Sequence, residues 1–317
     1  MTGSSAATAI VAEELRRTFG DVVAVDKISL AVPRGSVLGL LGVNGAGKTT
    51  MVRMLATVLK PDSGRGIVHG FDITTQPQDV RRSIGLAGQN AAVDENLTGR
   101  ENLELVGRLS HLGRSVSRDR ANQLLDQFGL VDAGNRPVRT YSGGMRRRLD
   151  LGAALVAQPP VLFLDEPTTG LDPASRLDLW GVIESLVSDG TTVLLTTQYL
   201  EEADRLADNI VVIDKGLIAA EGSAQQLKAR LGDTVIEFEF ASPAIAKSAA
   251  ETIDGTVSAG TVVRLVMTAG PATLRDAMNQ LAAADIAPNH VALREPTLDD
   301  VFLTLTGSGA ASTGATA

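Results

Sequence analysis

Short apolar runs alternate with stretches of helical periodicity along the first two thirds of the chain. The run from Ser36 to Leu41 leads through glycines into a helix-like stretch, and the runs from Val161 to Leu164 and from Thr192 to Leu195 are bounded by polar or turn residues. Continuous apolar runs of this length are typical of parallel strands that are buried on both faces. Because Pro173 to Ser188 has helical spacing, we predict a β-α-β unit and an α/β domain with a parallel sheet.

Residues 91–157 differ from this pattern, because they carry helical periodicity with little strand signal. Thr98 followed by Glu101 forms a capping box, in which the hydroxyl and the carboxylate satisfy backbone N–H groups at a helix start. We expect the helix that begins there to end at Gly113, since glycine is common just after a helix. The segment is therefore predicted to be a helical insertion in the α/β domain.

A third region begins near Asp233. Residues Thr234 to Phe240 alternate apolar and polar side chains, as a half-exposed strand does. The elements expected after it are a helical stretch, a strand near Thr261 to Met267, a helix from Thr273 to Ala284, a strand near His290 to Leu293, and a short helix from Thr297 whose capping box Asp300 completes. The βαββαβ order predicts a small α+β domain of the ferredoxin-like type.

These patterns divide the chain. We expect a large domain over residues 9–232, with its helical insertion at about 91–157, and a small domain over residues 233–306. The ends at 1–8 and 307–317 are rich in small residues and are predicted to be disordered. A length of 317 residues exceeds one average domain, which agrees with this division.

Composition narrows the class of protein. A hydrophobic content of 44% is enough for a packed core, but aromatics make up only 3%, so the core must consist of Ala, Val, Leu and Ile. The net charge of −8 argues against a protein that coats nucleic acid. The absence of cysteine excludes a disulfide framework and thiolate metal sites.

No apolar stretch of the sequence reaches the ~18–20 residues needed to span a bilayer. The best candidate, Leu151 to Leu164, is interrupted by Gln158, Pro159 and Pro160. The N-terminal MTGSSAATA lacks the basic and apolar segments of a secretory signal. A role at a membrane would therefore require a membrane-embedded partner.

The segment after the first predicted strand matches the P-loop pattern G-x-x-x-x-G-K-[ST]. Glycines at 42, 45 and 47 let the backbone approach phosphates closely, and its N–H groups then form an anion nest at a helix start. Lys48 is expected to reach the β- and γ-phosphates, and the hydroxyl of Thr49 to ligate Mg²⁺. The nucleotide-binding positions expected in this loop are Gly42, Asn44, Gly45, Ala46, Gly47, Lys48, Thr49 and Thr50.

An acidic pair lies at the end of the apolar run VLFLD. Asp165 is the last residue of the run, and Glu166 follows it. Asp165 is expected at the carboxyl end of a buried strand, where open α/β sheets place ligands, and it is suited to hold Mg²⁺ directly or through water. Glu166 faces differently along the strand and can polarise an attacking water as a general base. Such a pair can also simply mark a strand end, but the P-loop upstream favours the catalytic interpretation.

A glycine-rich start precedes the helix predicted from Met145 to Val156. Ser142 is a good N-cap there, and Gly143 and Gly144 allow close approach to the backbone. Arginines at 146, 147 and 148 stand in its first turns, although cations oppose the dipole at a helix N-terminus. They form either a solvated basic face or a positive helix end that meets an anion.

These pieces, in this order, resemble the ATP-binding subunits of ABC transporters over roughly residues 9–230. The P-loop is followed by IGLAGQ, by YSGGM in the place of the signature LSGGQ, by VLFLDEP and by TTGLD. The resemblance implies that Gln89 senses Mg²⁺ and nucleotide, that Asp172 belongs to the D-loop, and that Phe19 stacks on adenine. It also implies ATP and Mg²⁺ as cofactors, with Mg²⁺ held by Thr49, Gln89 and Asp165.

The resemblance further implies a dimer, since each chain carries one ATPase core. Two copies would pair head to tail, with each ATP between one P-loop and the other chain's signature. Ser142, Gly143 and Gly144 would then lie at the nucleotide in trans, with Ser142 and Gly144 contacting its γ-phosphate. This arrangement would give the basic helix start an anion to meet.

TTQYLEEAD, YSGGMRRRLD and LREPTLDDVFLTLTG together look like the daunorubicin/doxorubicin-resistance ATP-binding proteins of this family. Members of that group work at the cytoplasmic face of the membrane with a separate integral membrane permease, and they export antibiotics or lipids. Their C-terminal domain is thought to act in assembly or regulation. An importer subunit and a soluble ABC ATPase acting on ribosomes or DNA are the alternatives; the single core, the acidic balance and the predicted α+β C-terminal domain disfavour them.

One position departs from the family pattern. The family usually has a histidine shortly after the strand at Thr192 to Leu195, and this chain has Gln198. Glutamine can donate an amide hydrogen bond but cannot carry a proton or a positive charge. The substitution leaves Glu166 as the candidate base.

We predict that Gln198→Ala lowers ATP hydrolysis well below the wild-type rate, because it removes the amide donor. Gln198→His should retain activity, because an imidazole supplies a donor at the same place. Phosphate release by the purified variants measures both. An unchanged rate in Gln198→Ala would remove this residue from the mechanism.

Overall fold

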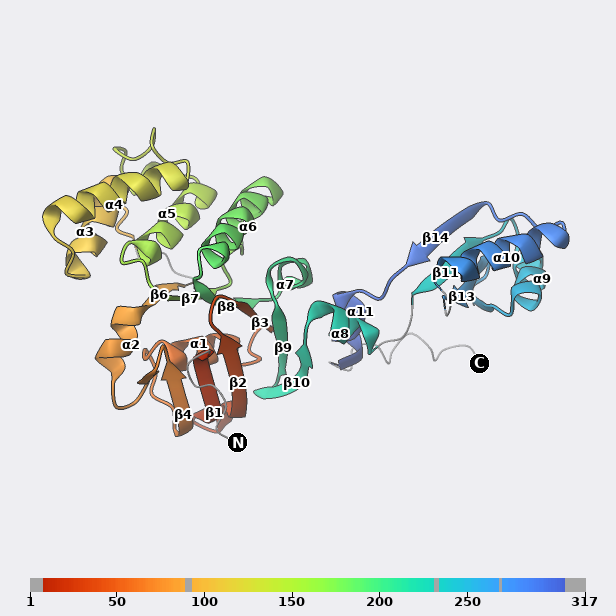
Figure 1. Cartoon of the computed structure of the whole chain (residues 1–317), viewed down its shortest axis with the longest axis horizontal. Helices are drawn as coiled ribbons and strands as arrows, with labels where there is room; N and C mark the ends of the chain where they lie inside the picture. Colours follow the sequence, from red (N-terminus) through yellow and green to blue (C-terminus); the bar gives the residue numbers. More distant parts are fainter. Residues whose placement is uncertain (1–7, 89–92, 231–233, 268–269, 306–317) are drawn as a thin grey trace. The chain divides into compact units, whose positions relative to one another are not determined.

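The structure is a computed structural model that describes residues 8–88, 93–230, 234–267 and 270–305 (Figure 1). The chain divides into two compact units between Ala224 and Gln225. The tails predicted at 1–8 and 307–317 lie outside the described residues, apart from Thr8, which begins the first strand.

A six-stranded sheet forms the centre of the first unit. Its strand order is β10-β9-β3-β8-β7-β6, and all neighbours are parallel except β9 and β10. The strands are β3 (Val37–Leu41), β6 (Ile84–Ala87), β7 (Val161–Asp165), β8 (Thr192–Thr197), β9 (Asn209–Asp214) and β10 (Leu217–Gly222). The predicted α/β fold is confirmed, including three predicted strands and helix α6 (Pro173–Ser188) between β7 and β8.

Both faces of this sheet are covered, which explains its continuous apolar runs. In β7, Val161 and Phe163 pack toward helix α1 (Lys48–Leu55), whereas Leu162 and Leu164 pack toward the opposite core. All four side chains are fully buried. Strand β7 is therefore held between two cores, with successive side chains in opposite ones.

A second, antiparallel sheet lies beyond α1 and has the order β2-β1-β4-β5. Its strands are β1 (Thr8–Phe19), β2 (Val22–Pro33), β4 (Ser63–Val68) and β5 (Phe71–Asp72). The sequence pattern does not predict this sheet. The pairing of β1 with β2 shifts register at several points, and Glu14 and Lys27 have positive φ angles. Such bulges break the period-2 alternation by which a strand is recognised.

The predicted insertion is helical in all its regular elements between residues 93 and 157. It contains α3 (Gly99–Leu109), α4 (Arg114–Gln127), the 3-10 turn Val138–Thr140 and α5 (Gly143–Leu155). The capping box of Thr98 and Glu101 is confirmed. The expected end of α3 at Gly113 is wrong, because the chain turns at His111 (φ 62°) and Gly113 is the N-cap of α4. Two short helices, α2 (Pro77–Ser83) and α7 (Leu200–Leu206), complete the unit.

The second unit holds a four-stranded antiparallel sheet of order β12-β13-β11-β14. Its elements are α8 (Ala224–Ala229), β11 (Val235–Glu239), α9 (Pro243–Ile253), β12 (Thr256–Ala259), β13 (Val262–Val266), α10 (Pro271–Ala283), β14 (His290–Arg294) and α11 (Leu298–Leu305). Helices α9 and α10 share one core with the sheet, around Ile236 and Phe238. The βαββαβ order and this strand arrangement confirm the ferredoxin-like prediction. No helix in the described part of the chain is long and apolar enough to cross a membrane.

Candidate nucleotide-binding site

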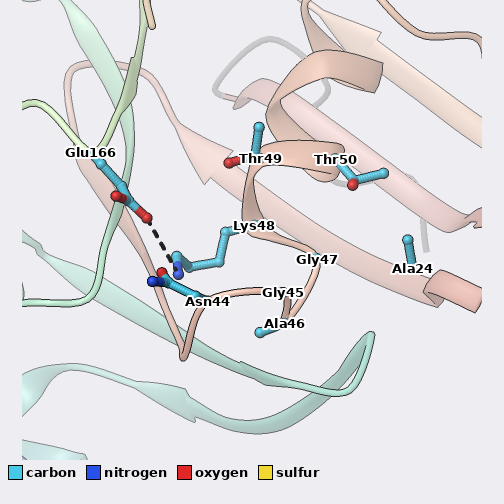
Figure 2. A pocket seen from close by; sticks show the side chains of 9 residues that line it. All are labelled: Ala24, Asn44, Gly45, Ala46, Gly47, Lys48, Thr49, Thr50 and Glu166. Carbon is cyan, nitrogen blue, oxygen red and sulfur yellow. Dashed lines mark ion pairs between the residues drawn. The ribbon is translucent and has the colours of Figure 1, made fainter. Parts of the chain in front are cut away.

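The P-loop joins the end of β3 to the start of α1 and lines a cavity of about 370 Å³ (Figure 2). Gly47 is the N-cap of α1 with φ 113°, which residues with a Cβ rarely adopt. A Cβ at Gly47 would also clash with the carbonyl oxygen of Ala24. The residues lining the cavity are Ala24, Asn44, Gly45, Ala46, Gly47, Lys48, Thr49, Thr50 and Glu166. The structure therefore brings nearly all the predicted P-loop residues to one cavity.

Lys48 lies at the wall of this cavity with its ammonium group buried. Its Nζ donates to the carbonyl oxygens of Gly42 (2.6 Å) and Val43 (3.1 Å), and it lies 3.7 Å from Glu166 Oε1. Figure 2 shows the two side chains pointing toward each other. Burial lowers the pKa of Lys48, and the nearby carboxylates of Glu166 and Asp165 oppose that shift. The lysine thus presents a positive charge where a phosphate would need one.

Asp165 ends β7 and joins three elements through one oxygen. Its Oδ1 accepts hydrogen bonds from Thr49 Oγ1 of α1 (3.0 Å) and from Thr196 Oγ1 of β8 (2.7 Å). The side chain is only 5% exposed. Because the carboxyl ends of parallel strands meet at one edge of the sheet, this carboxylate lies beside the P-loop helix, as predicted.

Glu166 follows Asp165 in a left-handed turn with φ 51°. Its backbone N–H donates to the carbonyl oxygen (3.1 Å) and the hydroxyl (3.0 Å) of Thr196. Thr169 Oγ1 donates to its Oε2 at 3.3 Å. The turn directs the carboxylate away from the strand axis and into the P-loop cavity, so Asp165 and Glu166 face different groups.

Two other predicted residues, Phe19 and Gln198, are not among the residues that line the cavity. Phe19 ends β1 and is 48% exposed, with the Arg17 guanidinium 5.0 Å above its ring centre. Gln198 directly follows β8, next to Thr197, and is half-buried. Gln89 lies outside the described residues. An exposed aromatic ring can stack on a base, which suits the expectation for Phe19.

The signature residues lie outside this cavity. Ser142 is the N-cap of α5, and its Oγ accepts from the N–H of Met145 at 3.2 Å. Ser142 and Gly143 are exposed. Asp172 caps α6 by accepting from the N–H of Ser175 at 2.9 Å, and this bond lowers the pKa of its carboxyl. In the single chain these residues lie at the starts of α5 and α6, and not at the P-loop.

The three arginines after the signature all contact groups of their own chain. Arg146 forms an ion pair with Glu95 at 2.6 Å. The side chain of Arg147 is only 12% exposed and points back into the protein. Arg148 donates to the carbonyl oxygen of Phe128 at 3.4 Å. The expectation of a solvated basic face is therefore wrong, because each guanidinium finds an acceptor within the chain.

Comparisons with known proteins agree with this geometry. Residues 25–169 match the family model described as ABC transporter. The chain is 52% identical over 306 residues to a daunorubicin resistance ATP-binding protein of Streptomyces coeruleorubidus, covering 95% of this chain and 96% of that protein. It is 48% identical over 316 residues to a doxorubicin resistance ATP-binding protein of Mycobacterium tuberculosis (strain CDC 1551 / Oshkosh), covering 94% and 93%.

Among solved structures, the chain resembles cbiO1 of Clostridium perfringens, a part of the ABC transporter complex cbiONQ. The TM-score is 0.65 at 26% identity, and the match covers 71% of this chain and 92% of that one. The chain belongs to the ABC transporter family. Its matches of nearly full length place it among the family's daunorubicin/doxorubicin-resistance ATP-binding proteins. Like other ABC transporter ATPases, it binds and hydrolyses ATP, and such subunits dimerise and work with permease partners.

Two residues of this ABC ATPase site are not predicted from the sequence. Thr196 supports both Asp165 and Glu166, and Ala24 of β2 lines the cavity. The sequence could have indicated Thr196, because it is a polar residue directly after the apolar run of a predicted strand, where α/β sheets place ligand-facing groups. Ala24 has no such signal, because it belongs to the sheet that the sequence pattern does not predict.

We predict that Gly47→Ala weakens ATP binding about 10- to 100-fold, since backbone strain of ~1–3 kcal/mol would have to be relieved by moving the loop. The clash with the Ala24 carbonyl adds to that strain. Gly113→Ala is the matched control, because Gly113 has φ −60° and open space around its Cβ position. Titration with a fluorescent ATP analogue measures both; equal affinities for Gly47→Ala and the wild type would contradict the assignment.

Proposed function

We propose that this chain powers the export of an anthracycline-like antibiotic or a lipid through a separate membrane permease. The observation that carries the proposal is the match of nearly full length to daunorubicin and doxorubicin resistance proteins, which spans both units. A Nod factor export ATP-binding protein of Ralstonia nicotianae is also 39% identical over 93% of this chain. Export is thus named in a relative that matches the C-terminal unit as well as the ATPase core.

In the proposed mechanism Glu166 is the general base. Its carboxylate lines the P-loop cavity, is 8% exposed, and is aimed by the Thr196 contacts. Lys48, which now pairs with Glu166, neutralises the β- and γ-phosphates when ATP fills the cavity. Gln198 donates its amide to the γ-phosphate, and Phe19 stacks on the adenine. Glu166 and Lys48 line the cavity, and the roles of Phe19 and Gln198 follow from the family resemblance.

The residues at the cavity suit Mg²⁺ as the partner of ATP. Thr49 Oγ1 and Asp165 Oδ1 are 3.0 Å apart, and both are hard oxygen ligands. Among the described residues no group of three or more His, Cys, Asp or Glu could hold a metal by itself. That donor set fits Mg²⁺, which is commonly bound through one or two carboxylates, waters and substrate phosphates. Bound there with Gln89 as a further ligand, Mg²⁺ would neutralise charge on the phosphates.

The working unit in this proposal is a dimer with two shared sites. Ser142, Gly143 and Gly144 stand at the start of α5, outside the cavity of their own chain. A helix start offers unpaired N–H groups to an anion. In the dimer, the signature of one chain covers the γ-phosphate held by the P-loop of the other, with Asp172 nearby.

We place the permease contact in a groove of the first unit, with the chain on the cytoplasmic face of the membrane. The groove has a volume of about 720 Å³ and runs between α2, β6 and the helices α3 and α5. Its lining combines cationic Arg81 and Arg82 with apolar Leu109, which is 70% exposed. Such a mixture suits a short amphipathic helix of a partner. The C-terminal unit would act in assembly or regulation.

We predict that Glu166→Gln abolishes most phosphate release while leaving ATP binding intact. The amide keeps the size of the side chain but cannot take a proton from water. Phosphate release and binding of a fluorescent ATP analogue are measured on the same preparation. Equal hydrolysis rates in the variant and the wild type would refute Glu166 as the base.

Transport itself is tested in cells that express the chain together with its permease. We expect faster efflux of daunorubicin than in cells expressing the permease with the Glu166→Gln chain, because only hydrolysis resets the dimer. Retained cellular drug fluorescence measures the difference. Equal retention in the two strains would reject an anthracycline as cargo, and the same strains can then be assayed with labelled lipid.

A further inference from the structure

Arg147 makes the most extensive set of contacts of the three arginines behind the signature. It lies in the second turn of α5, five residues after the N-cap Ser142. Its guanidinium donates to four backbone carbonyl oxygens: those of Pro167 (2.6 Å), Glu166 (2.9 Å), Asp165 (3.1 Å) and Gly88. Three of these oxygens belong to consecutive residues that include both acidic residues of the ATP site.

The charge of Arg147 is held in a polar pocket of the interior. Burial lowers the pKa of its guanidinium, and the carboxylates of Asp150, Asp165, Glu202 and Glu166 oppose that shift. Asp150 Oδ2 lies 3.5 Å from Nη1. Arginine stays charged at any physiological pH, and its planar fork donates in several fixed directions at once. A lysine at this position would keep the charge but could not reproduce the fork.

The turn that Arg147 holds is a strained one. Glu166 has φ 51°, a region that costs a residue with a Cβ on the order of 1 kcal/mol or more and persists only when the surroundings fix it. Thr196 fixes the turn from the side of β8 through the N–H of Glu166. Arg147 fixes it from the side of α5, through the carbonyl oxygens of Glu166 and its two neighbours.

We propose that Arg147 is a positioning residue for Glu166, which ties the direction of that carboxylate to the signature helix of the same chain. Because Ser142 and Arg147 lie on one rigid helix, a shift of its start moves the guanidinium and the Asp165–Pro167 turn together. The Gly88 contact extends the link to the residue that follows β6. The contact set therefore joins both acidic residues and two strand ends to one helix.

The inference rests on the proposed function, in which the start of α5 meets the nucleotide held by a second copy. The nucleotide at the partner's P-loop then aligns the general base at this chain's own P-loop. Each site thereby becomes competent when the opposite signature is engaged, which makes hydrolysis cooperative in ATP. A residue that only stabilised α5 would not connect the two sites.

The test compares Arg147→Lys and Arg147→Gln in the full chain, with Arg148→Lys as the matched control one residue along the same helix. Arg148 makes its contact with Phe128, away from the acidic turn. For the Arg147 variants we expect kcat to fall roughly 10- to 100-fold, the cost of a catalytic group displaced by about 1 Å. KM for ATP should change less than about twofold, and the Hill coefficient should approach 1.

A double-mutant cycle with Glu166→Gln separates positioning from general stabilisation. If Arg147 acts through the Glu166 carboxylate, Arg147→Lys should change the residual rate of Glu166→Gln by less than about twofold. An equally large loss in that background, or a wild-type kcat and Hill coefficient in the single variants, would overturn the proposal. So would loss of the folded state in both Arg147 variants, measured by thermal melting, since Arg147 would then be a structural residue.

Failure of the proposed function would give different experimental results. Hydrolysis by the wild type with a Hill coefficient of about 1, unchanged by Glu166→Gln, would reject the shared-site dimer and its base together. Cooperative hydrolysis that depends on Glu166 but not on Arg147 would reject only the positioning role. The Arg148→Lys control should match the wild type in kcat, KM and melting temperature.

Discussion

The carboxylate of Asp165 is the point on which the rest of the site depends. One of its oxygens accepts from Thr49 on α1 and from Thr196 on β8, so a single buried group fixes the P-loop helix against two neighbouring strands. Removing a buried acceptor of this kind would leave two hydroxyl donors unsatisfied. The parallel sheet makes the junction possible, because β3, β7 and β8 all deliver their carboxyl ends to the same edge.

The parts of the fold that the sequence predicts are those with an unbroken period. β7 and β8 are continuous apolar runs because cores lie on both faces, and α6 begins at the proline that follows its N-cap, Asp172. The antiparallel sheet is missed because its bulged strands lose alternation. The end of α3 is misplaced for a related reason. Gly113 suits a helix start as well as a helix end, and only the turn at His111 decides between them.

In the candidate site, residues that are contiguous in the sequence are predicted, whereas residues that are distant in the sequence are not. The P-loop and the acidic pair are recognisable because each is a contiguous motif. The structure places the P-loop and Glu166 at one cavity and bonds Asp165 to Thr49 of the P-loop helix. Thr196 and Arg147 act on Glu166 from 30 and 19 positions away in the chain. Spacing along the sequence carries no information about such contacts. A fold-level rule, that polar residues at strand ends face the ligand, can recover Thr196 but not Arg147.

The start of α5 shows how an electrostatic conflict is resolved by geometry. Three arginines follow a helix start whose dipole repels cations, and in isolation they would destabilise it. In the fold each charge is carried away from the helix start: Arg146 reaches Glu95, Arg147 reaches the carbonyl oxygens behind the acidic pair, and Arg148 reaches Phe128. Ser142 and Gly143 remain exposed at the tip. The helix can therefore present its backbone N–H groups to an anion while the arginines anchor it to the protein, and the anchor with the most contacts is Arg147, which holds the turn of Asp165 and Glu166.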